Sequence, residues 1–205
     1  MARNTEAKSH YVETEHDVKT WMMAGPCVQT ARPPRCVICD APGVDANGKV
    51  ILHGHGLRER TLLGPLDAGG EPKATRVVMQ RYACQRCKAV LTVGPRGLLP
   101  WRRYSAMALA LALWWWGVYQ LTDPVVREQT SPVEDEGLSR PERWTTLRRW
   151  GRAVQEGRLW PRVSIDPSWS LRECAKRAAL LLWSRGSPDS STDEGRVFRG
   201  AALAH

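Results

Sequence analysis

The sequence lacks the features by which secreted and membrane proteins are usually recognised. Residues 1–20, MARNTEAKSHYVETEHDVKT, are polar and charged and contain no apolar run of the kind found in a secretory signal. One apolar stretch, SAMALALALWWWGVYQL at 105–121, resembles a membrane span, but it is slightly short and contains Gly117 and Gln120. We therefore expect a cytoplasmic protein with no membrane partner, in which this stretch forms a buried or amphipathic helix.

Residue patterns typical of enzymes are also missing. The sequence shows no Ser/His/Asp arrangement for nucleophilic catalysis and no glycine-rich loop that would cradle a phosphate. Its paired cysteines do not lie in the βαβ context that is typical of a thioredoxin-like redox centre. We therefore expect that the protein is not an enzyme.

The chain has an excess of positive charge. Its 205 residues include 30 Lys and Arg against 21 Asp and Glu, which gives a formal net charge of +9. Four zinc-bound thiolates with one zinc ion would lower this to about +7. A basic chain of this size favours a polyanionic partner, with DNA as the first candidate and RNA not distinguished from it. A basic protein without such a partner is the alternative.

Two Cys-x-x-Cys pairs give the strongest chemical signal. Cys36 and Cys39 lie in RPPRCVICDAPG, and Cys84 and Cys87 lie in RYACQRCKAVLTVGPRG. Tetrahedral zinc binds four such thiolates at about 2.3 Å, and two tight turns brought together by a β-hairpin supply them. Because all four ligands come from the protein, the sequence predicts a structural Zn²⁺ site with no position open for catalysis.

The other sulfur and imidazole groups are weaker candidates for metal binding. Cys27 and Cys174 stand alone, and we interpret them as incidental or core thiols. His53 and His55 in HGHG are alternative ligands, but four cysteines already complete a zinc site. We therefore expect these histidines to be strand residues or to face nucleic acid.

The pattern of strand and helix formers predicts an α+β fold, with a small zinc-ribbon β-hairpin module followed by an all-α helix-turn-helix-like bundle. GKVILHGHGLRERTLL and ATRVVMQRYAC are rich in strand formers, and the turn residues at 64–73 separate them into a hairpin. The predicted segments are an N-terminal arm at 1–33 that is disordered or holds a short helix at 18–23, a zinc ribbon at 34–100, the helical domain at 101–162, a C-terminal helix at 163–186 and a disordered tail at 187–205.

Capping and stop signals predict four helices. The first runs from Ala106 to about Gln120 after the cap Ser105, and its three tryptophans at 114–116 are expected mainly to pack in the core, with base stacking as the alternative. The second is a short helix before Pro132, with Asp123 as cap and Pro124 at its first position. The third opens with Ser139 and Glu142 in capping-box register and ends at about Glu156, before Gly157. The fourth is a helix at 167–185, before Gly186.

One of these helices carries the candidate DNA-binding face. At 100° per residue, Leu147, Trp150 and Val154 fall on one side, with Trp144 at its margin. Arginine, glutamine and threonine on the other side suit phosphates and base edges. The candidate residues are Arg143, Thr145, Arg148, Arg149, Arg152 and Gln155, together with Arg102 and Arg103. The alternative is that this basic face is simply exposed to solvent. The acidic link at 130–139 is longer than the usual helix-turn-helix turn, which counts against a compact motif of that kind.

A set of motifs resembles a known family. The segments CVIC, HGHGLRER, RYACQRCKAVLTVGPRGLLPWRRYS and RWTTLRRW together resemble the N-terminal zinc-ribbon and helix-turn-helix region of bacterial insertion-sequence transposases and related stand-alone zinc-ribbon domains of unknown function. The resemblance extends from about Cys36 to Trp160. It implies that the four paired cysteines bind zinc and that the helix with Arg148 and Arg149 meets DNA.

The resemblance also limits the expected function. Such transposases continue into an RNase H-like catalytic domain, whereas the residues after Trp160 offer one predicted helix and a tail. We therefore expect a zinc-dependent DNA-binding protein that is a transposase-related accessory, a regulator or a remnant without the catalytic domain. The alternative is an interaction module that docks a transposase or another nucleic-acid-handling protein.

Overall fold

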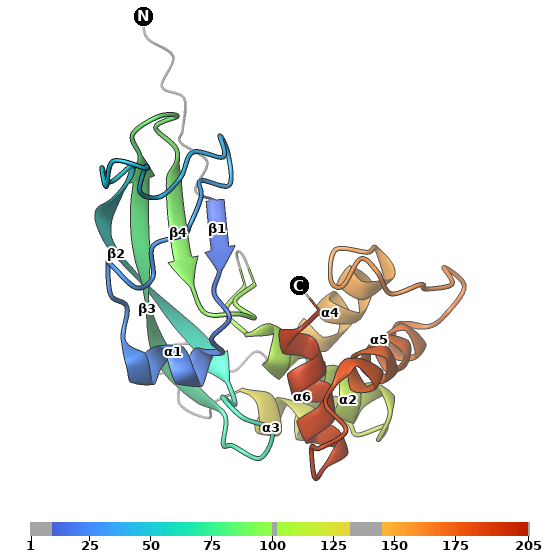
Figure 1. The fold of residues 1–205 in the computed structure, drawn as a ribbon. Coiled ribbons are helices and arrows are strands. Elements are labelled where there is room, and N and C mark those ends of the chain that lie inside the picture. Colours follow the sequence, from blue (N-terminus) through green and yellow to red (C-terminus); the bar gives the residue numbers. More distant parts are fainter. Residues whose placement is uncertain (1–9, 100–101, 132–144, 205) are drawn as a thin grey trace, which may run out of the picture. The chain divides into compact units, whose positions relative to one another are not determined.

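The fold is α+β, as the sequence predicts. The computed structural model describes residues 10–99, 102–131 and 145–204, and these contain one four-stranded sheet and six helices (Figure 1). In chain order the elements are β1 (His10–Glu13), α1 (Val18–Ala24), β2 (Leu52–Gly64), β3 (Lys73–Cys84), β4 (Val90–Gly94), α2 (Ala106–Gly117), α3 (Asp123–Thr130), α4 (Thr146–Gln155), α5 (Leu171–Arg185) and α6 (Asp193–Ala202).

Contacts divide the described residues into two compact units. The sheet unit comprises the described residues of Met1–Arg60 and Arg76–Pro100, and the helical unit comprises those of Thr61–Thr75 and Trp101–His205. The chain changes units after Arg60, after Thr75 and after Pro100. The residues of the predicted hairpin turn belong to the helical unit, where Leu63, near the end of β2, pairs with Tyr104 and donates its N–H to the Arg103 carbonyl at 2.7 Å.

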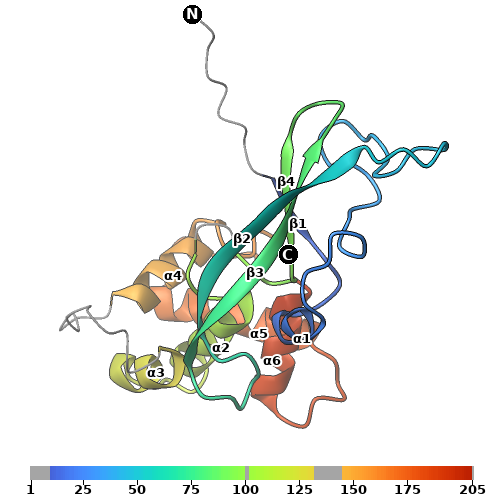
Figure 2. The same cartoon turned by 90° about the vertical axis from the view of Figure 1, so that its left-hand side faces the viewer.

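The strands of the sheet lie in the order β1-β4-β3-β2. Strands β2 and β3 form the predicted hairpin, which Figure 2 shows as a long twisted ribbon. Strand β4 runs antiparallel to β3, with Leu91 opposite Tyr82, and β1 runs parallel to β4, with His10 opposite Leu91. The core of this unit contains the fully buried side chains of Leu52, Val77 and Tyr82.

The N-terminal segment, which we predicted to be disordered or to hold one short helix, packs on the sheet over its described part. The helix is present as α1, and Asp17 caps it by accepting a hydrogen bond from the Thr20 N–H at 2.7 Å. The Trp21 side chain is 3 % exposed, and its indole donates to the Val78 carbonyl at 2.8 Å. Disorder is therefore wrong for residues 10–33, because β1 and Trp21 bury apolar surface that outweighs the weak local signal.

Helix α2 is the centre of the helical unit. It contacts α3, α4, α5 and α6, and all its residues except Trp115 are buried. Ser105 caps it as predicted, accepting a hydrogen bond from the Ala108 N–H at 3.0 Å. Trp114 and Trp116 are buried, so core packing is confirmed for two of the three tryptophans. Among the described residues, no helix combines the length and apolar character needed to cross a membrane.

The predicted disorder at 187–205 is wrong for most of that segment. Residues Asp193–Ala202 form α6, whose Thr192 cap accepts a hydrogen bond from the Gly195 N–H at 3.0 Å. Helix α6 packs against both α5 and α2, and Val197 and Ala201 are fully buried. Close approach explains the packing, since Gly200 lies so near the Leu182 carbonyl of α5 that a Cβ there would overlap it. The polar composition of SPDSSTDEG hid this short apolar face from sequence analysis.

The remaining helix boundaries differ by a few residues from those predicted. Helix α3 begins at Asp123 itself, so Thr122 is its N-cap and Pro124 lies one residue later than expected. Helix α5 begins at Leu171, where Ser170 and Glu173 form a capping box that a start at Pro167 overlooks. The predicted capping box at Ser139 and Glu142 lies outside the described residues.

Candidate metal centre and basic helix

The four predicted metal ligands come together in the sheet unit. The Sγ atoms of Cys36 and Cys87 lie 3.7 Å apart, as do those of Cys39 and Cys84. All four sulfurs lie within 4.8 Å of one another. Four sulfurs at about 2.3 Å from a tetrahedral ion would be separated by about 3.8 Å, so this cluster can hold a metal ion. The spacing of the two pairs in the sequence therefore identified a set of residues that meets in space.

The two cysteine turns have the same backbone conformation. In each turn, the N–H of the residue after the second cysteine donates to the carbonyl of the first cysteine. The N–H of the first cysteine donates to the carbonyl of the alanine that comes one residue later. The residues after the second cysteines, Asp40 and Lys88, have φ of 57° and 62°, which is the left-handed region. The hydrogen bonds are Asp40 N–H to Cys36 O at 2.9 Å and Lys88 N–H to Cys84 O at 2.9 Å, with Cys36 N–H to Ala41 O at 2.8 Å and Cys84 N–H to Ala89 O at 2.9 Å.

Sequence analysis missed these two left-handed residues. The signal that would have found them is the longer repeat Cys-x-x-Cys-x-Ala, which CVICDA and CQRCKA share. Aspartate tolerates the left-handed region better than lysine does. The Asp40 carboxylate also accepts two hydrogen bonds from Arg35, at 2.6 and 2.7 Å, and these hold the pKa of Asp40 below its usual range. Lys88 is therefore the more strained of the two positions.

Replacement of Lys88 by glycine is expected to stabilise the metal-loaded protein. Glycine adopts positive φ without steric cost, whereas other residues pay about 1–2 kcal/mol there, partly offset by the greater chain entropy of glycine. We expect a net gain of about 0.5–1 kcal/mol, measured as a higher midpoint of chemical denaturation. Lys73→Gly, at an exposed position that begins β3, is the control and should destabilise. Equal loss of stability in both variants would contradict the expectation.

The surroundings of the sulfur atoms shift the pKa values of two neighbouring thiols, Cys84 and Cys87, in opposite directions. Burial alone would raise the pKa of the Cys84 thiol, but backbone N–H groups of Cys87 and Arg86 bond to its sulfur and lower its pKa below the usual value. Burial raises the pKa of the Cys87 thiol, and hydrogen bonds with the neighbouring cysteines raise it further. These surroundings therefore oppose ionisation of the Cys87 thiol, and a bound cation would supply the compensating charge.

The alternative ligands lie outside this cluster. His53 is exposed, and its Nε2–H donates to the Val50 carbonyl at 2.8 Å. His55 is also exposed. Cys27 is exposed at the surface of the sheet unit, whereas Cys174 is fully buried in the helical unit as a core thiol. The metal-binding group among the described residues therefore contains the four paired cysteines and none of these side chains.

Helix α4 has the two faces that its sequence predicts. Leu147, Trp150 and Val154 are buried, and the Trp150 ring meets Tyr104 edge-on with centroids 5.0 Å apart. Gly151 lets α4 approach α2 and α5, because a Cβ there would lie 3.3 Å from the Trp116 ring and 3.0 Å from the Leu171 carbonyl. The exposed face presents Thr145, Arg148, Arg149 and Arg152. Three guanidinium groups thus project from one side of a helix that is anchored on the other.

The other candidate DNA-binding residues do not all join this face. Gln155 is half-buried, and its side-chain amide donates to the carbonyls of Pro167 and Trp169 at 3.3 and 3.2 Å. Arg102 is half-buried, and burial followed by the nearby Arg158 lowers its pKa. Arg103 is exposed, and Arg143 lies outside the described residues. Gln155 is therefore committed to holding the loop before α5, which makes it a poor candidate for nucleic-acid contact.

Comparison of the chain with protein-family models, with curated proteins and with solved structures finds no match. The resemblance to insertion-sequence transposases therefore stays a prediction that rests on the motifs themselves.

Proposed function

We propose that the protein is a zinc-dependent DNA-binding protein, a transposase-related accessory factor or regulator that associates with the nucleoid. The sheet unit would be a zinc ribbon with Zn²⁺ on Cys36, Cys39, Cys84 and Cys87. An all-sulfur set of four ligands is typical of structural zinc, and the 3.7 Å sulfur separations match the edge of a Zn–thiolate tetrahedron. The zinc would fix the register of the strands and take no part in chemistry.

The observation that carries the DNA-binding proposal is the exposed face of α4. Arg148, Arg149 and Arg152 project from a helix whose opposite side is buried, in a chain with a net charge of +9. Arginine binds phosphates and guanine edges through several N–H donors, so such a face suits a DNA groove. The helix-turn-helix arrangement of α3 and α4 belongs to the same proposal, with α2 as the element against which both pack.

A double substitution on this face tests the proposal. Arg149→Ala with Arg152→Ala is expected to weaken DNA binding at least tenfold in a mobility-shift assay, because two phosphate or base contacts disappear. The slope of log K against log salt concentration should also become shallower by about 2, one for each lost phosphate contact. The zinc content should not change.

The control removes the same charge elsewhere. Arg177→Ala with Arg199→Ala replaces two exposed arginines on α5 and α6. Equal loss of affinity in both double variants would reject the assigned face, because only the total charge would then matter. If neither variant changes binding, a pull-down from nuclease-treated lysate distinguishes a protein-docking module, and a retained protein partner would overturn the DNA-binding proposal.

A further inference from the structure

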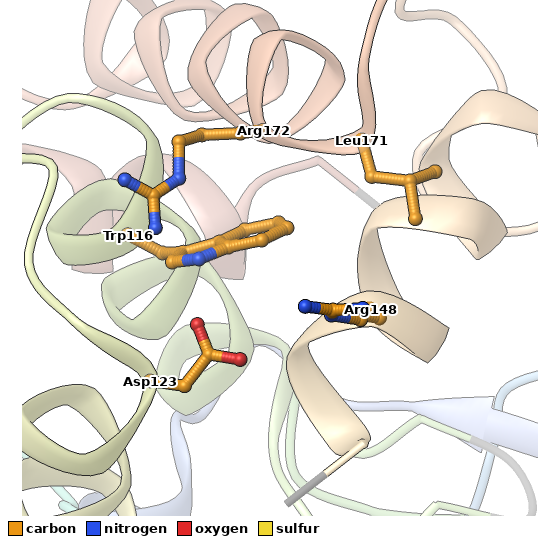
Figure 3. A pocket seen from close by; sticks show the side chains of 5 residues that line it. All are labelled: Trp116, Asp123, Arg148, Leu171 and Arg172. Carbon is orange, nitrogen blue, oxygen red and sulfur yellow. The ribbon is translucent and has the colours of Figure 1, made fainter.

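A pocket of about 280 Å³ lies within the helical unit, where four helices meet. It is lined by Trp116 from α2, Asp123 from α3, Arg148 from α4, and Leu171 and Arg172 from α5 (Figure 3). Two guanidinium groups, one carboxylate and one indole therefore surround a single space. Arg149 and Arg152, which carry the DNA-binding test, do not line it.

The Trp116 indole points to a missing hydrogen-bond acceptor. Its side chain is 5 % exposed, and its Nε1–H is buried without an acceptor among the described residues. The nitrogen-bearing edge of the ring faces the space beside the Asp123 carboxylate in Figure 3. A buried N–H that is left unpaired costs about 1–3 kcal/mol, so an acceptor atom bound in the pocket would relieve that penalty.

The charged groups around the pocket are available to a ligand. The Arg172 guanidinium stacks over the Trp116 ring at 5.2 Å, and it reaches the Gln120 and Leu121 carbonyls only at 3.5 Å. Three of its five N–H groups are not used in these contacts. Arg148 is exposed, and no described cation lies within 4.0 Å of the Asp123 carboxylate. The pocket therefore carries a net positive charge and has three donor groups for one acceptor.

We propose that this pocket binds a phosphate group that carries a proton. A phosphate group that retains a proton presents both acceptor oxygens and a hydroxyl donor, which match the N–H donors of the two arginines and Trp116 and the acceptor oxygens of the Asp123 carboxylate. Arginine binds phosphate through parallel N–H donors. Sulfate and phosphodiesters carry no proton near neutral pH, so they would set an oxygen against Asp123. The pocket shares Arg148 with the proposed DNA-binding face, but the proposal goes beyond DNA binding because the zinc site, Arg149 and Arg152 take no part in it.

Titration of the metal-loaded protein with sodium phosphate tests the proposal. Tryptophan indole N–H signals in ¹⁵N-labelled protein report on the site, and Trp116→Phe or triple-resonance data assign the Trp116 signal. At pH 6 and constant ionic strength, we expect that signal to shift saturably with phosphate. Calorimetry should give an affinity for sulfate at least tenfold lower than the affinity for phosphate.

Two variants and one control make the test specific. Arg148→Gln is expected to weaken phosphate binding at least tenfold, whereas Arg199→Gln, at an exposed position of α6 outside the pocket, should leave it unchanged. Asp123→Asn should remove the preference of phosphate over sulfate, because the amide donates to an unprotonated oxygen. An unmoved Trp116 signal, equal affinity for sulfate, or equal effects of the two arginine variants would overturn the proposal.

The source of the phosphate group is distinguished by a second titration. A 5′-phosphorylated dinucleotide is compared with its 5′-hydroxyl form at pH 6, near the second pKa of about 6 of phosphate monoesters. Binding of the phosphorylated form at least as tight as that of free phosphate would identify the end of a nucleic-acid strand as the ligand. Tighter binding of free phosphate would identify the inorganic ion. Both results require the Trp116 signal to shift.

Discussion

Cys84→Ser is expected to abolish metal binding and to unfold the sheet unit. Serine does not replace a thiolate on zinc, and Cys84 is fully buried beside Cys39, which lies 45 residues earlier in the chain. Structural zinc sites contribute about 10–16 kcal/mol to folding, which is comparable with the whole stability of a domain of this size. Loss of even about 3 kcal/mol would lower the Tm by about 12–24 °C.

Elemental analysis and thermal unfolding measure the two effects. The wild-type chain should contain one zinc ion, and a strong chelator should reproduce the loss of stability in the variant. Cys27→Ser is the matched control because this thiol is exposed and lies outside the cluster, so zinc content and Tm should stay unchanged. One tightly bound zinc ion in the Cys84→Ser protein, or none in the wild type, would refute the assigned site.

Gly200→Ala is expected to detach α6 from α5. The added Cβ would overlap the backbone carbonyl of Leu182, and a backbone atom cannot move aside as the end of a flexible side chain does. Overpacking of this kind costs typically 1–3 kcal/mol and more when backbone must shift, so we expect a loss of about 3 kcal/mol. The higher helix propensity of alanine would recover about 1 kcal/mol at most.

A second glycine in the same helix supplies the control. A Cβ at Gly195 would lie 3.1 Å from the Thr192 Oγ1, a side-chain atom, so Gly195→Ala should change stability little. Denaturant unfolding measures both variants, and hydrogen exchange of the α6 amides shows whether the helix separates. Equal stability of the two variants would mean that α6 does not pack on α5 as the structure places it.

The features that the sequence predicted well are those with a local signature. The spacing of the cysteine pairs indicates a shared metal site. Two runs of strand formers around the turn residues at 64–73 indicate the hairpin. Ser105 and Gly186 mark helix ends because capping depends on residues close in the chain. The amphipathic pattern of α4 likewise lies within a few turns of one helix.

The features that were missed depend on partners far away in the chain. Strand β1 is four residues long and pairs with β4 about 80 positions later, so nothing near His10 signals it. Helix α6 forms because Gly200 fits against Leu182, and its flanking residues are mostly polar. The pocket at Trp116 gathers residues from four helices, and no sequence motif joins Asp123 to Arg172.

Because the two cysteine turns share one backbone conformation with different residues between the cysteines, the side chains at these positions are not needed to form the turn. Val37 and Ile38 are 57 % and 47 % exposed in one turn, whereas Gln85 and Arg86 are exposed in the other. The same backbone conformation therefore presents an apolar surface in one turn and a polar, positively charged surface in the other. Exchanging these four side chains between the two turns would exchange the surface chemistry of the turns and leave the positions of the sulfur atoms unchanged.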